Sequence, residues 1–546
     1  MSASNKKKLR HAENVAKLTE RQVKEQAEAK KLNLYTTLFV VVLAVLLVAA
    51  VTVGVIKSVQ GTGIRERSTT ALTVGEHELN NVELNYYYVD AVNNFLSNYG
   101  SYASLLGLDT TLPLDQQVVN AETGLTWADD FLNTAKNNAK AVYTMVDAAK
   151  AEGYTLSAEE EAQVDAVIQN MESYALLYGF GNTKAYLQAM YGNGATVESY
   201  KDYCRNSILA DSFYYNYATN LTYEDAELRA YEAEDPKVYN SYSYNYYYLS
   251  ATKFLEGGTT DEEGNVTYSD EEKAAALEDA EAAAKTLTAD TINSVESLET
   301  ALNRLSINDG VEATTIACDD YLYSSVMTVL SDWVTDESRQ EGDLTYIPST
   351  STSTDEDGNE VVTTNGYYVI FFRGSSDNIF PLVNARHILV AFEGGTYDST
   401  TGVTTYTDEE KAAAHAEAEE LLAQWKSGEA TEDSFAALAN EKSDDAGSNT
   451  KGGLYTDIYP GQMVANFNDW CFADERKAGD YGLIDTEYGY HLMFYVGDNE
   501  TTYRDYMVTN DKLKADMEEW FDGIVKNSQY EEKNMKHVKT DLILGM

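Results

Sequence analysis

The sequence has few basic residues, and this shortage excludes one large class of proteins. It contains 40 lysines and arginines against 89 aspartates and glutamates. Nine of the basic residues lie within residues 1–33, so the remaining chain has 31 basic residues against 85 acidic ones. A protein surface with this charge repels the phosphate backbone of DNA and RNA. We therefore expect no nucleic-acid partner.

Cysteine and proline are also scarce. The three cysteines, Cys204, Cys318 and Cys471, are odd in number, far apart in the sequence and without C-x-x-C spacing. This pattern predicts neither a disulfide framework nor a zinc site, and we expect no metal or other cofactor. The five prolines are accompanied by 42 tyrosines. That composition is typical of a folded chain rather than a low-complexity one.

Charged residues are absent from one long stretch, the 25 residues from Leu32 to Ile56. A helix of this length can cross a bilayer about 30 Å thick, at about 1.5 Å per residue. We predict a single transmembrane helix over residues 34–57, preceded by a basic segment, residues 1–33. Because the basic residues precede the helix, the positive-inside rule places the N-terminus in the cytoplasm and the bulk of the chain outside the cell membrane. A cleaved signal peptide remains an alternative.

After a short linker, residues 58–70, the sequence predicts a helical domain over residues 71–235. Two helices are marked by start boxes at Thr126 and Ser157, where a hydroxyl and an acidic residue three positions later satisfy free backbone N–H groups. A last amphipathic helix and an alternating segment lie within residues 501–546, without an apolar partner nearby in the sequence. We expect this C-terminal part to pack on the helical domain.

The region between these two parts contains an internal repeat. The run Y-S-D-E-E-K that starts at Tyr268 returns as Y-T-D-E-E-K at Tyr406, and other short matches follow in the same order. We predict a duplication, with a first copy at residues 236–380 and a second copy at residues 381–500.

Two of the three histidines in the second copy, His387 and His491, each lie within an alternating apolar run that predicts a strand. If the two strands pair, the imidazoles can lie side by side. A histidine in an apolar strand is more often a hydrogen-bonded core residue than a catalytic one, so both interpretations stay open. The first copy has Tyr368 at the position of His491, and His387 falls near Tyr247. The first copy is therefore expected to lack the site.

Four spaced motifs around the histidines resemble the parvulin family of peptidyl-prolyl isomerases. They are R-H-I-L-V at Arg386, S-D-D at Ser443, G-Q-M-V-x-x-F at Gly461 and G-Y-H at Gly489. The organisation of the whole chain resembles the bacterial extracytoplasmic foldases of the SurA and PrsA type. The resemblance implies an α+β protein with an N-terminal transmembrane helix, a helical SurA-like chaperone domain and two tandem parvulin-like α/β domains, the first degenerate. It also implies a C-terminal helix that returns to the chaperone domain.

The resemblance further implies roles for individual residues. Four would form a catalytic polar network beside the twisting amide: His387, Asp445, Thr486 and His491. Three would line the pocket for the proline ring: Leu454, Met463 and Phe467. On spacing alone, Met463 and Phe467 would be core residues. The family's usual G-D-L-G is replaced here by Gly453-Leu454-Tyr455, which predicts an altered pocket rim.

The function implied by the resemblance is a peptidyl-prolyl cis-trans isomerase that assists the folding of secreted proteins. Its partners would be unfolded or newly translocated polypeptides that contain Xaa-Pro bonds, together with the membrane that holds the anchor. A homodimer is left open. The main alternative is a holdase chaperone, in which the parvulin domains bind clients as scaffolds without catalysis.

Overall fold

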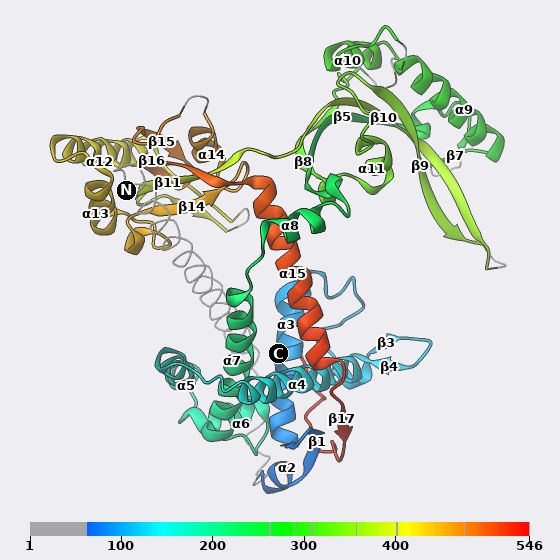
Figure 1. Ribbon diagram of the computed structural model, residues 1–546. Helices are drawn as coiled ribbons and strands as arrows, with labels where there is room; N and C mark the ends of the chain where they lie inside the picture. The colour runs from blue at the N-terminus through cyan, green and yellow to red at the C-terminus, as the bar shows by residue number, and fades with distance from the viewer. Residues whose placement is uncertain are drawn as a thin grey trace. The chain divides into compact units, whose positions relative to one another are not determined.

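The computed structural model describes residues 63–544, except residues 261–263, 289, 306, 308–309, 356–357, 400–401 and 474–475. The chain divides into two compact units, one containing residues up to 222 and from 513 onward, the other residues 223–512. The boundary between them falls within α15 (Tyr503–Val525). Both helices and strands are present (Figure 1), so the α+β class is confirmed.

The predicted cytoplasmic segment and the predicted transmembrane helix, residues 34–57, lie outside the described residues. Within the part of the chain that is described, no helix is both long enough and apolar enough to span a bilayer.

The first unit is built from helices whose starts are set by capping side chains. Its main helices are α3 (Asn81–Tyr99), α4 (Trp127–Ala151), α5 (Ala158–Leu177), α6 (Thr183–Tyr191) and α7 (Val197–Asn220). The start boxes predicted at Thr126 and Ser157 are present, and each hydroxyl accepts the backbone N–H three residues later. α6 is not predicted by the sequence pattern, because this short helix is capped by Asn182 without an acidic partner in its first turn.

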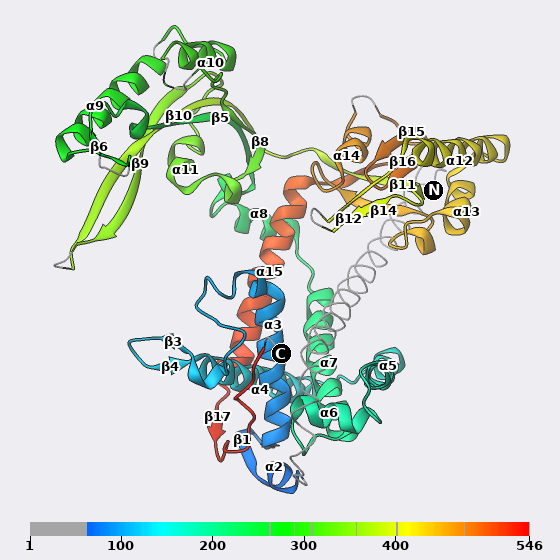
Figure 2. The ribbon, with the colours of Figure 1, turned by 180° about the vertical axis from the view of Figure 1, so that it is seen from behind.

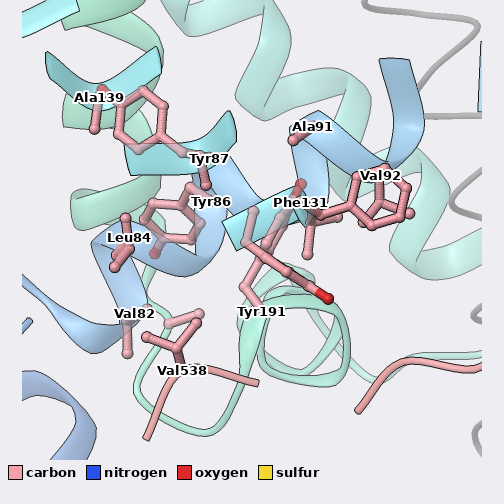
Figure 3. Close-up of a cluster of buried hydrophobic side chains, with 14 of the residues drawn as sticks. Val82, Leu84, Tyr86, Tyr87, Ala91, Val92, Phe131, Ala139, Tyr191 and Val538 are labelled. Atoms are coloured by element: carbon pink, nitrogen blue, oxygen red, sulfur yellow. The ribbon is translucent and has the colours of Figure 1, made fainter. Parts of the chain in front are cut away.

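The core of the first unit lies where α3 meets α4 and α7, and it is rich in tyrosine. Figures 1 and 2 both show α4 crossing α3. In the core, Tyr86 and Tyr87 of α3 lie near Tyr191 and Phe131 (Figure 3). The rings of Tyr86 and Tyr191 meet edge to face with their centroids 5.0 Å apart. The Tyr86 hydroxyl is hydrogen-bonded to Ser199 at 2.8 Å, which allows the phenol to be buried without an unsatisfied polar group.

The C-terminal segment completes the first unit. β17 (Tyr530–Glu532) pairs antiparallel with β1 (Thr70–Val74), which pairs in turn with β2 (His77–Asn80). The alternating segment predicted after β17 is not a strand. Its apolar residues Val538 and Leu544 are nevertheless buried in the helical core.

The second unit contains two four-stranded antiparallel sheets. The strands of the first sheet, in the order β8-β5-β10-β9, are β5 (Ser241–Ser250), β8 (Ile316–Leu322), β9 (Leu344–Thr354) and β10 (Glu360–Ser376). Those of the second, in the order β14-β11-β16-β15, are β11 (Pro381–Ala391), β14 (Leu454–Ile458), β15 (Tyr481–Thr486) and β16 (Gly489–Thr502). In both sheets the first and last strands in sequence pair at the centre.

Helices cover both faces of each sheet. On the first sheet, α9 (Asp270–Leu287) and α10 (Val295–Arg304) pack on one face and α11 (Thr328–Val334) on the other. On the second sheet, α12 (Asp408–Ser427) and α13 (Glu432–Lys442) pack on one face and α14 (Ala465–Cys471) on the other. The two sheets therefore share both strand order and helix arrangement.

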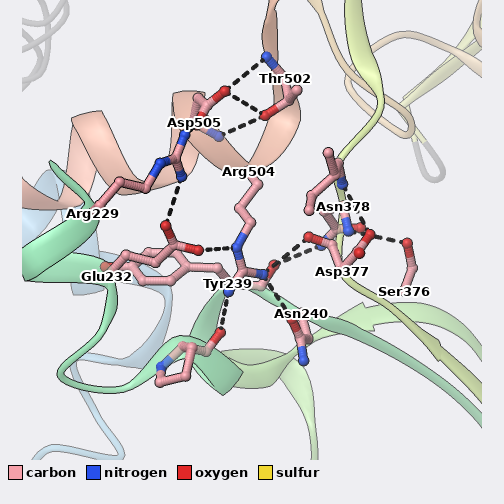
Figure 4. Close-up of polar contacts among 12 residues, drawn as sticks. Arg229, Glu232, Tyr239, Asn240, Ser376, Asp377, Asn378, Thr502, Arg504 and Asp505 are labelled. Atoms are coloured by element: carbon pink, nitrogen blue, oxygen red, sulfur yellow. Dashed lines mark hydrogen bonds and ion pairs between the residues drawn. The ribbon is translucent and has the colours of Figure 1, made fainter. Parts of the chain in front are cut away.

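A buried arginine joins the segments that lead into and between the sheets. The Arg504 guanidinium donates to three oxygens, Asn240 Oδ1 at 2.7 Å, Pro236 O at 2.7 Å and Asp377 O at 3.0 Å (Figure 4). It also forms an ion pair with Glu232 of α8 (Asp225–Glu232). A buried guanidinium needs this full set of acceptors, because an unpaired buried charge is strongly destabilising.

Asn81 attaches the C-terminal segment to α3. Its fully buried side chain donates to Thr69 O at 2.8 Å and Asn534 O at 2.9 Å, and accepts the His537 N–H at 3.1 Å. We expect Asn81→Ala to lower the free energy of unfolding by about 3 kcal/mol, because three backbone groups lose a partner. Denaturant unfolding followed by circular dichroism measures this change. Asn94→Ala, on the exposed part of the same helix, should cost less than about 0.5 kcal/mol, and equal losses in both variants would contradict the attachment.

Candidate active site

The two central strands of the second sheet bring the predicted histidines together. β11 and β16 are antiparallel, and their register pairs Leu389 with His491 and His387 with Met493. Because residues two apart on a strand share a face, both imidazoles project from the same face of the sheet. Their Nδ1 atoms lie 2.8 Å apart. Both residues are buried, His387 with 3% and His491 with 5% of its surface exposed.

A half-buried carboxylate extends the histidine pair at one end. His387 Nε2 lies 2.8 Å from Asp445 Oδ2 and 3.1 Å from Ser448 Oγ. The same carboxylate oxygen accepts hydrogen bonds from the Ser448 hydroxyl and, at 3.1 Å, from the Tyr455 hydroxyl. Asp445 Oδ2 is therefore surrounded by three polar partners, which compensate its partial burial.

The other end of the chain of hydrogen bonds is Thr486, whose Oγ1 lies 2.9 Å from His491 Nε2. One arrangement of protons satisfies the three contacts along this chain: His387 Nε2–H donates to Asp445, His387 Nδ1 accepts from His491, and His491 Nε2 accepts from the Thr486 hydroxyl. Each imidazole nitrogen then has one defined role. The four residues predicted for the polar network are thus contiguous in space.

The loop that carries Asp445 is held along β11 by hydrogen bonds. Leu389 N donates to Ser443 Oγ at 3.1 Å, and Leu389 O accepts from Asp444 N at 2.9 Å. The Asp444 carboxylate accepts the Ala391 N–H at 2.9 Å. These contacts fix the position of the Asp445 side chain relative to the histidine strand, so the network is preorganised.

Gly453 brings a second loop against the same strand. His387 N donates to Gly453 O at 2.8 Å, and a Cβ atom on Gly453 would lie 2.0 Å from His387 O. The φ angle of Gly453 is 67°, in the left-handed region that favours glycine. Arg386 secures the loop by donating to Lys451 O at 3.1 Å and Gly452 O at 2.9 Å. Only glycine fits where this loop meets the strand.

Burial and hydrogen bonding shift the pKa values of the network. Burial alone would raise the pKa of Asp445, but hydrogen bonds from His387 and Ser448 outweigh it and hold that pKa well below its ordinary value. Burial lowers the pKa of His491 to about 3, and the neighbouring His387 imidazole adds to this effect. Burial, together with the Asp445 charge, raises the pKa of the Tyr455 hydroxyl well above its ordinary value. At neutral pH the site therefore holds a carboxylate, a neutral His491 and an intact phenol.

An aromatic ring covers the histidine pair. Phe467 of α14 is 1% exposed, and its centroid lies 5.4 Å from that of His387 and 5.8 Å from that of His491, edge-on to both. Met463 is half-buried in the same apolar cluster, together with Tyr455. Of the three residues predicted to line a proline pocket, the structure thus brings Phe467 and Met463 to the histidine face.

Leu454 does not lie on this face. It pairs with Arg386 across β11 and β14, and Arg386 precedes His387, so its side chain points to the opposite side of the sheet. Tyr455 lies on the histidine face instead, with its ring centroid 5.3 Å from that of His387. The sequence analysis missed Tyr455 and Ser448 as network members. The altered motif around Leu454 was the only signal for Tyr455, and no motif marked Ser448.

The first sheet has other residues at the histidine positions. When the two sheets are aligned through their central strand pairs, His491 falls on Tyr368, as predicted, and His387 falls on Tyr246 rather than Tyr247. The rings of Tyr246 and Tyr368 meet edge to face with centroids 5.9 Å apart. The imidazole pair is therefore replaced by a pair of phenols.

The close approach at Gly453 makes a direct prediction. Gly453→Ala should lower the free energy of unfolding of the second sheet and its helices by more than about 2 kcal/mol, because the methyl group collides with His387 O. Gly461→Ala is a matched control, since Gly461 also has a positive φ, 83°, but open space around its Cβ position. It should cost only about 1 kcal/mol. Denaturant unfolding monitored by tryptophan fluorescence compares the two, and similar costs would contradict the steric role.

The lowered pKa of His491 predicts a pH-dependent stability. The unfolded chain protonates this imidazole near 6.5, whereas the folded chain keeps it neutral down to about 3. The contribution of His491 to the free energy of unfolding is therefore fully present above pH 6.5. Below pH 6.5 it decreases by up to about 1.4 kcal/mol per pH unit. Asp445 contributes in the same direction only below about 3.9. Hydrogen exchange of the β11 and β16 amides between pH 6.5 and 4 measures the slope.

His491→Gln should flatten this slope, whatever its effect on the stability at neutral pH. His415→Gln is the matched control, because the His415 side chain is 41% exposed on α12 of the same sheet and helices. An unchanged slope in His491→Gln, or an equally flattened one in the control, would contradict the assignment.

Comparison with known proteins gives matches that centre on this site. Residues 374–498 match the family model of the PPIC-type PPIase domain. Foldase protein PrsA 1 of Listeria monocytogenes is 37% identical over 78 residues, 14% of this chain and 25% of the relative. Foldase protein PrsA 3 of Bacillus cereus is 34% identical over 86 residues, 16% of this chain and 29% of the relative. The chain thus spans about a quarter of the length of the curated relatives it matches.

Among solved structures, the crystal structure of PrsA from Bacillus subtilis covers 76% of this chain and 93% of its own, at 16% identity and a TM-score of 0.26. The family match contains β11, β16, the loop of Asp445 and α14, which together form the buried network. Over residues 374–498, the chain is therefore similar to the parvulin-type, or PPIC-type, domain of peptidyl-prolyl isomerases.

Proposed function

We propose that this protein is an extracytoplasmic foldase that catalyses the cis-trans isomerisation of Xaa-Pro bonds in unfolded or newly translocated polypeptides. The observation that carries the proposal is the buried chain of hydrogen bonds from Thr486 through His491 and His387 to Asp445, with Phe467 against both imidazoles. The matches to PrsA foldases support the same conclusion for the segment that they cover.

The reaction requires a twisted amide to be bound more tightly than either planar form. Rotation about the peptide bond has a barrier of about 18 to 20 kcal/mol, and no covalent bond to the protein is needed to lower it. In the twisted state the nitrogen loses conjugation, so an apolar surface suits the pyrrolidine ring. Met463 and Phe467 supply such a surface beside a rigid polar network.

Asp445 acts in this proposal as an anchor rather than as a nucleophile. Its Oδ2 is held by His387, Ser448 and Tyr455, and its depressed pKa reflects the stabilisation of the carboxylate by hydrogen bonds. A carboxylate occupied in this way is a poor nucleophile. Its role is to orient His387, which in turn orients His491.

We further propose that the two sheets of the second unit are tandem parvulin-like domains, residues 236–380 and 381–500, that arose by duplication. The identical strand order and helix arrangement support this proposal. The first domain has Tyr246 and Tyr368 in place of the histidines, which supports a non-catalytic role for it. Residues 71–235 and 501–546 would form the chaperone part.

The location outside the cytoplasm rests on the sequence. The charge-free stretch over residues 34–57 and the nine basic residues before it favour a single-pass anchor in the cell membrane, with the chain's bulk outside. A holdase that binds clients without catalysis is the second candidate function. It is favoured by the acidic, tyrosine-rich composition. It is also favoured by the position of Tyr455, which lies on the histidine face where Leu454 was predicted.

An isomerase assay separates the two functions. We expect the protein to accelerate the isomerisation of a short Xaa-Pro peptide and the refolding of a protein limited by proline isomerisation. Met463→Ala should lower kcat/KM by about tenfold, since part of the surface for the proline ring is lost. The double variant Met463→Ala/Phe467→Ala should lower it further.

Val326→Ala is the matched control, because Val326 occupies the corresponding place in the apolar cluster of the first sheet. It should leave kcat/KM unchanged. Circular dichroism must show that each variant is folded. A wild-type rate no higher than that of the double variant would exclude the isomerase, and suppression of client aggregation would then support the holdase.

A further inference from the structure

Residues 99–119, which run from the last residue of α3 through most of the connection to α4 and are called here the 99–119 loop, present large apolar side chains to solvent. Leu105 is 82% exposed, and six further apolar residues of the loop are also exposed: Tyr99, Tyr102, Leu106, Leu112, Val118 and Val119. Single exposed apolar residues are ordinary on a protein surface, but a run of them within one loop is typical of an interaction site.

The loop is ordered by buried polar contacts, so its apolar side chains are held outward. Gln117 is 8% exposed, and its side chain accepts the Asp109 N–H at 2.7 Å and donates to Asp109 O and Leu112 O, both at 2.9 Å. Leu108 and Leu114 are buried beneath the loop. The Gln117 amide thus holds the loop in one conformation while its leucines stay exposed. A surface that is ordered before binding loses less conformational entropy when a partner binds.

The surroundings of the loop are acidic. The sequence has no lysine or arginine between Arg67 and Lys136, whereas Asp109, Asp115 and Glu122 are exposed in or beside the loop. The C-terminal segment touches the loop, because Leu114 N donates to Leu542 O at 3.0 Å, and the residue before Leu542 is Asp541. An apolar surface inside a negative field selects partners that combine apolar and basic groups.

This charge argues against two other occupants. An anionic bilayer surface is repelled by the acidic side chains around the loop. A second copy of this chain carries the same excess of acidic residues, 89 against 40, and is repelled as well. An extended polypeptide with basic residues beside its apolar ones meets both requirements.

We propose that the 99–119 loop is a docking surface for polypeptide segments in which a short run of apolar side chains is flanked by lysine or arginine. This inference rests on the proposed foldase function and adds to it a preference among clients. The leucines and tyrosines would bury the apolar run, and the acidic residues around them would pair with the flanking charges. Proline is not required for this docking, which is separate from the histidine network.

The test uses the full-length protein and labelled peptides without proline. One peptide has an apolar core flanked by lysines, and the other has the same core flanked by glutamates. We expect the lysine peptide to bind at least about tenfold more tightly at low ionic strength, with the difference shrinking as salt is added. Fluorescence anisotropy measures both dissociation constants.

Three variants test the surface itself. Leu105→Ser/Leu106→Ser should weaken binding of the lysine peptide by about tenfold or more, because two exposed anchors are lost. Leu176→Ser/Leu177→Ser, which changes two leucines that are 73% and 71% exposed at the end of α5, should leave it within about twofold. The charge-reversed variant Asp115→Lys/Glu122→Lys should prefer the glutamate peptide.

Isomerisation of a short Xaa-Pro peptide is measured in parallel. It should be unchanged in all three variants, so loss of docking is distinguishable from loss of the proposed isomerase activity. The docking proposal is overturned if both peptides bind equally or if the α5 variant loses as much affinity as the loop variant. Binding to anionic vesicles in preference to peptides, or self-association that depends on Leu105 and Leu106, would also overturn it.

Discussion

The hydrogen bond between His387 and His491 depends on a single register of two central strands. In β11 and β16, side chains alternate between the face covered by α14 and the face covered by α12 and α13. A slip of one residue in either strand would turn its histidine to the wrong face, where Ile388 and Leu492 now pack. Because that slip would also move these apolar residues out of their cluster, the hydrophobic core enforces the register on which the polar network depends.

The first sheet shows what the same framework becomes without the imidazoles. Its strands and helices are arranged in the same way, but Tyr246 and Tyr368 stand at the two positions and Leu330 lies in the apolar cluster on that face. A phenol has one polar atom, and both tyrosines are only partly buried. A buried imidazole instead needs a partner for each nitrogen. Exchange of the histidines for tyrosines therefore removes the need for a carboxylate at one end and a hydroxyl at the other.

Sequence reasoning predicted the features that repeat regularly along the chain. Alternation predicted the two histidine strands, with the imidazoles side by side if these strands paired, as β11 and β16 do, and the start boxes at Thr126 and Ser157 marked the helix starts. The predictions were wrong where only the pairing of strands decides on which face of the sheet a side chain lies. β14 changes register along β11 and contains Asp457 at a φ of 56°, so the side of the sheet that Leu454 faces could not be counted from the sequence. Ser448 reaches the network from a turn whose backbone bonds to Asp445, with Ser448 N donating to Asp445 O at 3.2 Å, and no sequence motif marked this turn.

The acidic character of the chain acts differently on the surface and in the site. Surface charges act through water, and their field is screened within about 8 to 10 Å at physiological ionic strength. The charge of Asp445 is compensated at contact distance by His387, Ser448 and Tyr455, so it depends little on salt. Rotation about an amide transfers no charge to the protein, so the reaction needs no charged imidazole at His491. The proposed recognition by surface charge and the proposed isomerisation in the buried network can therefore vary independently, and a substitution in one need not disturb the other.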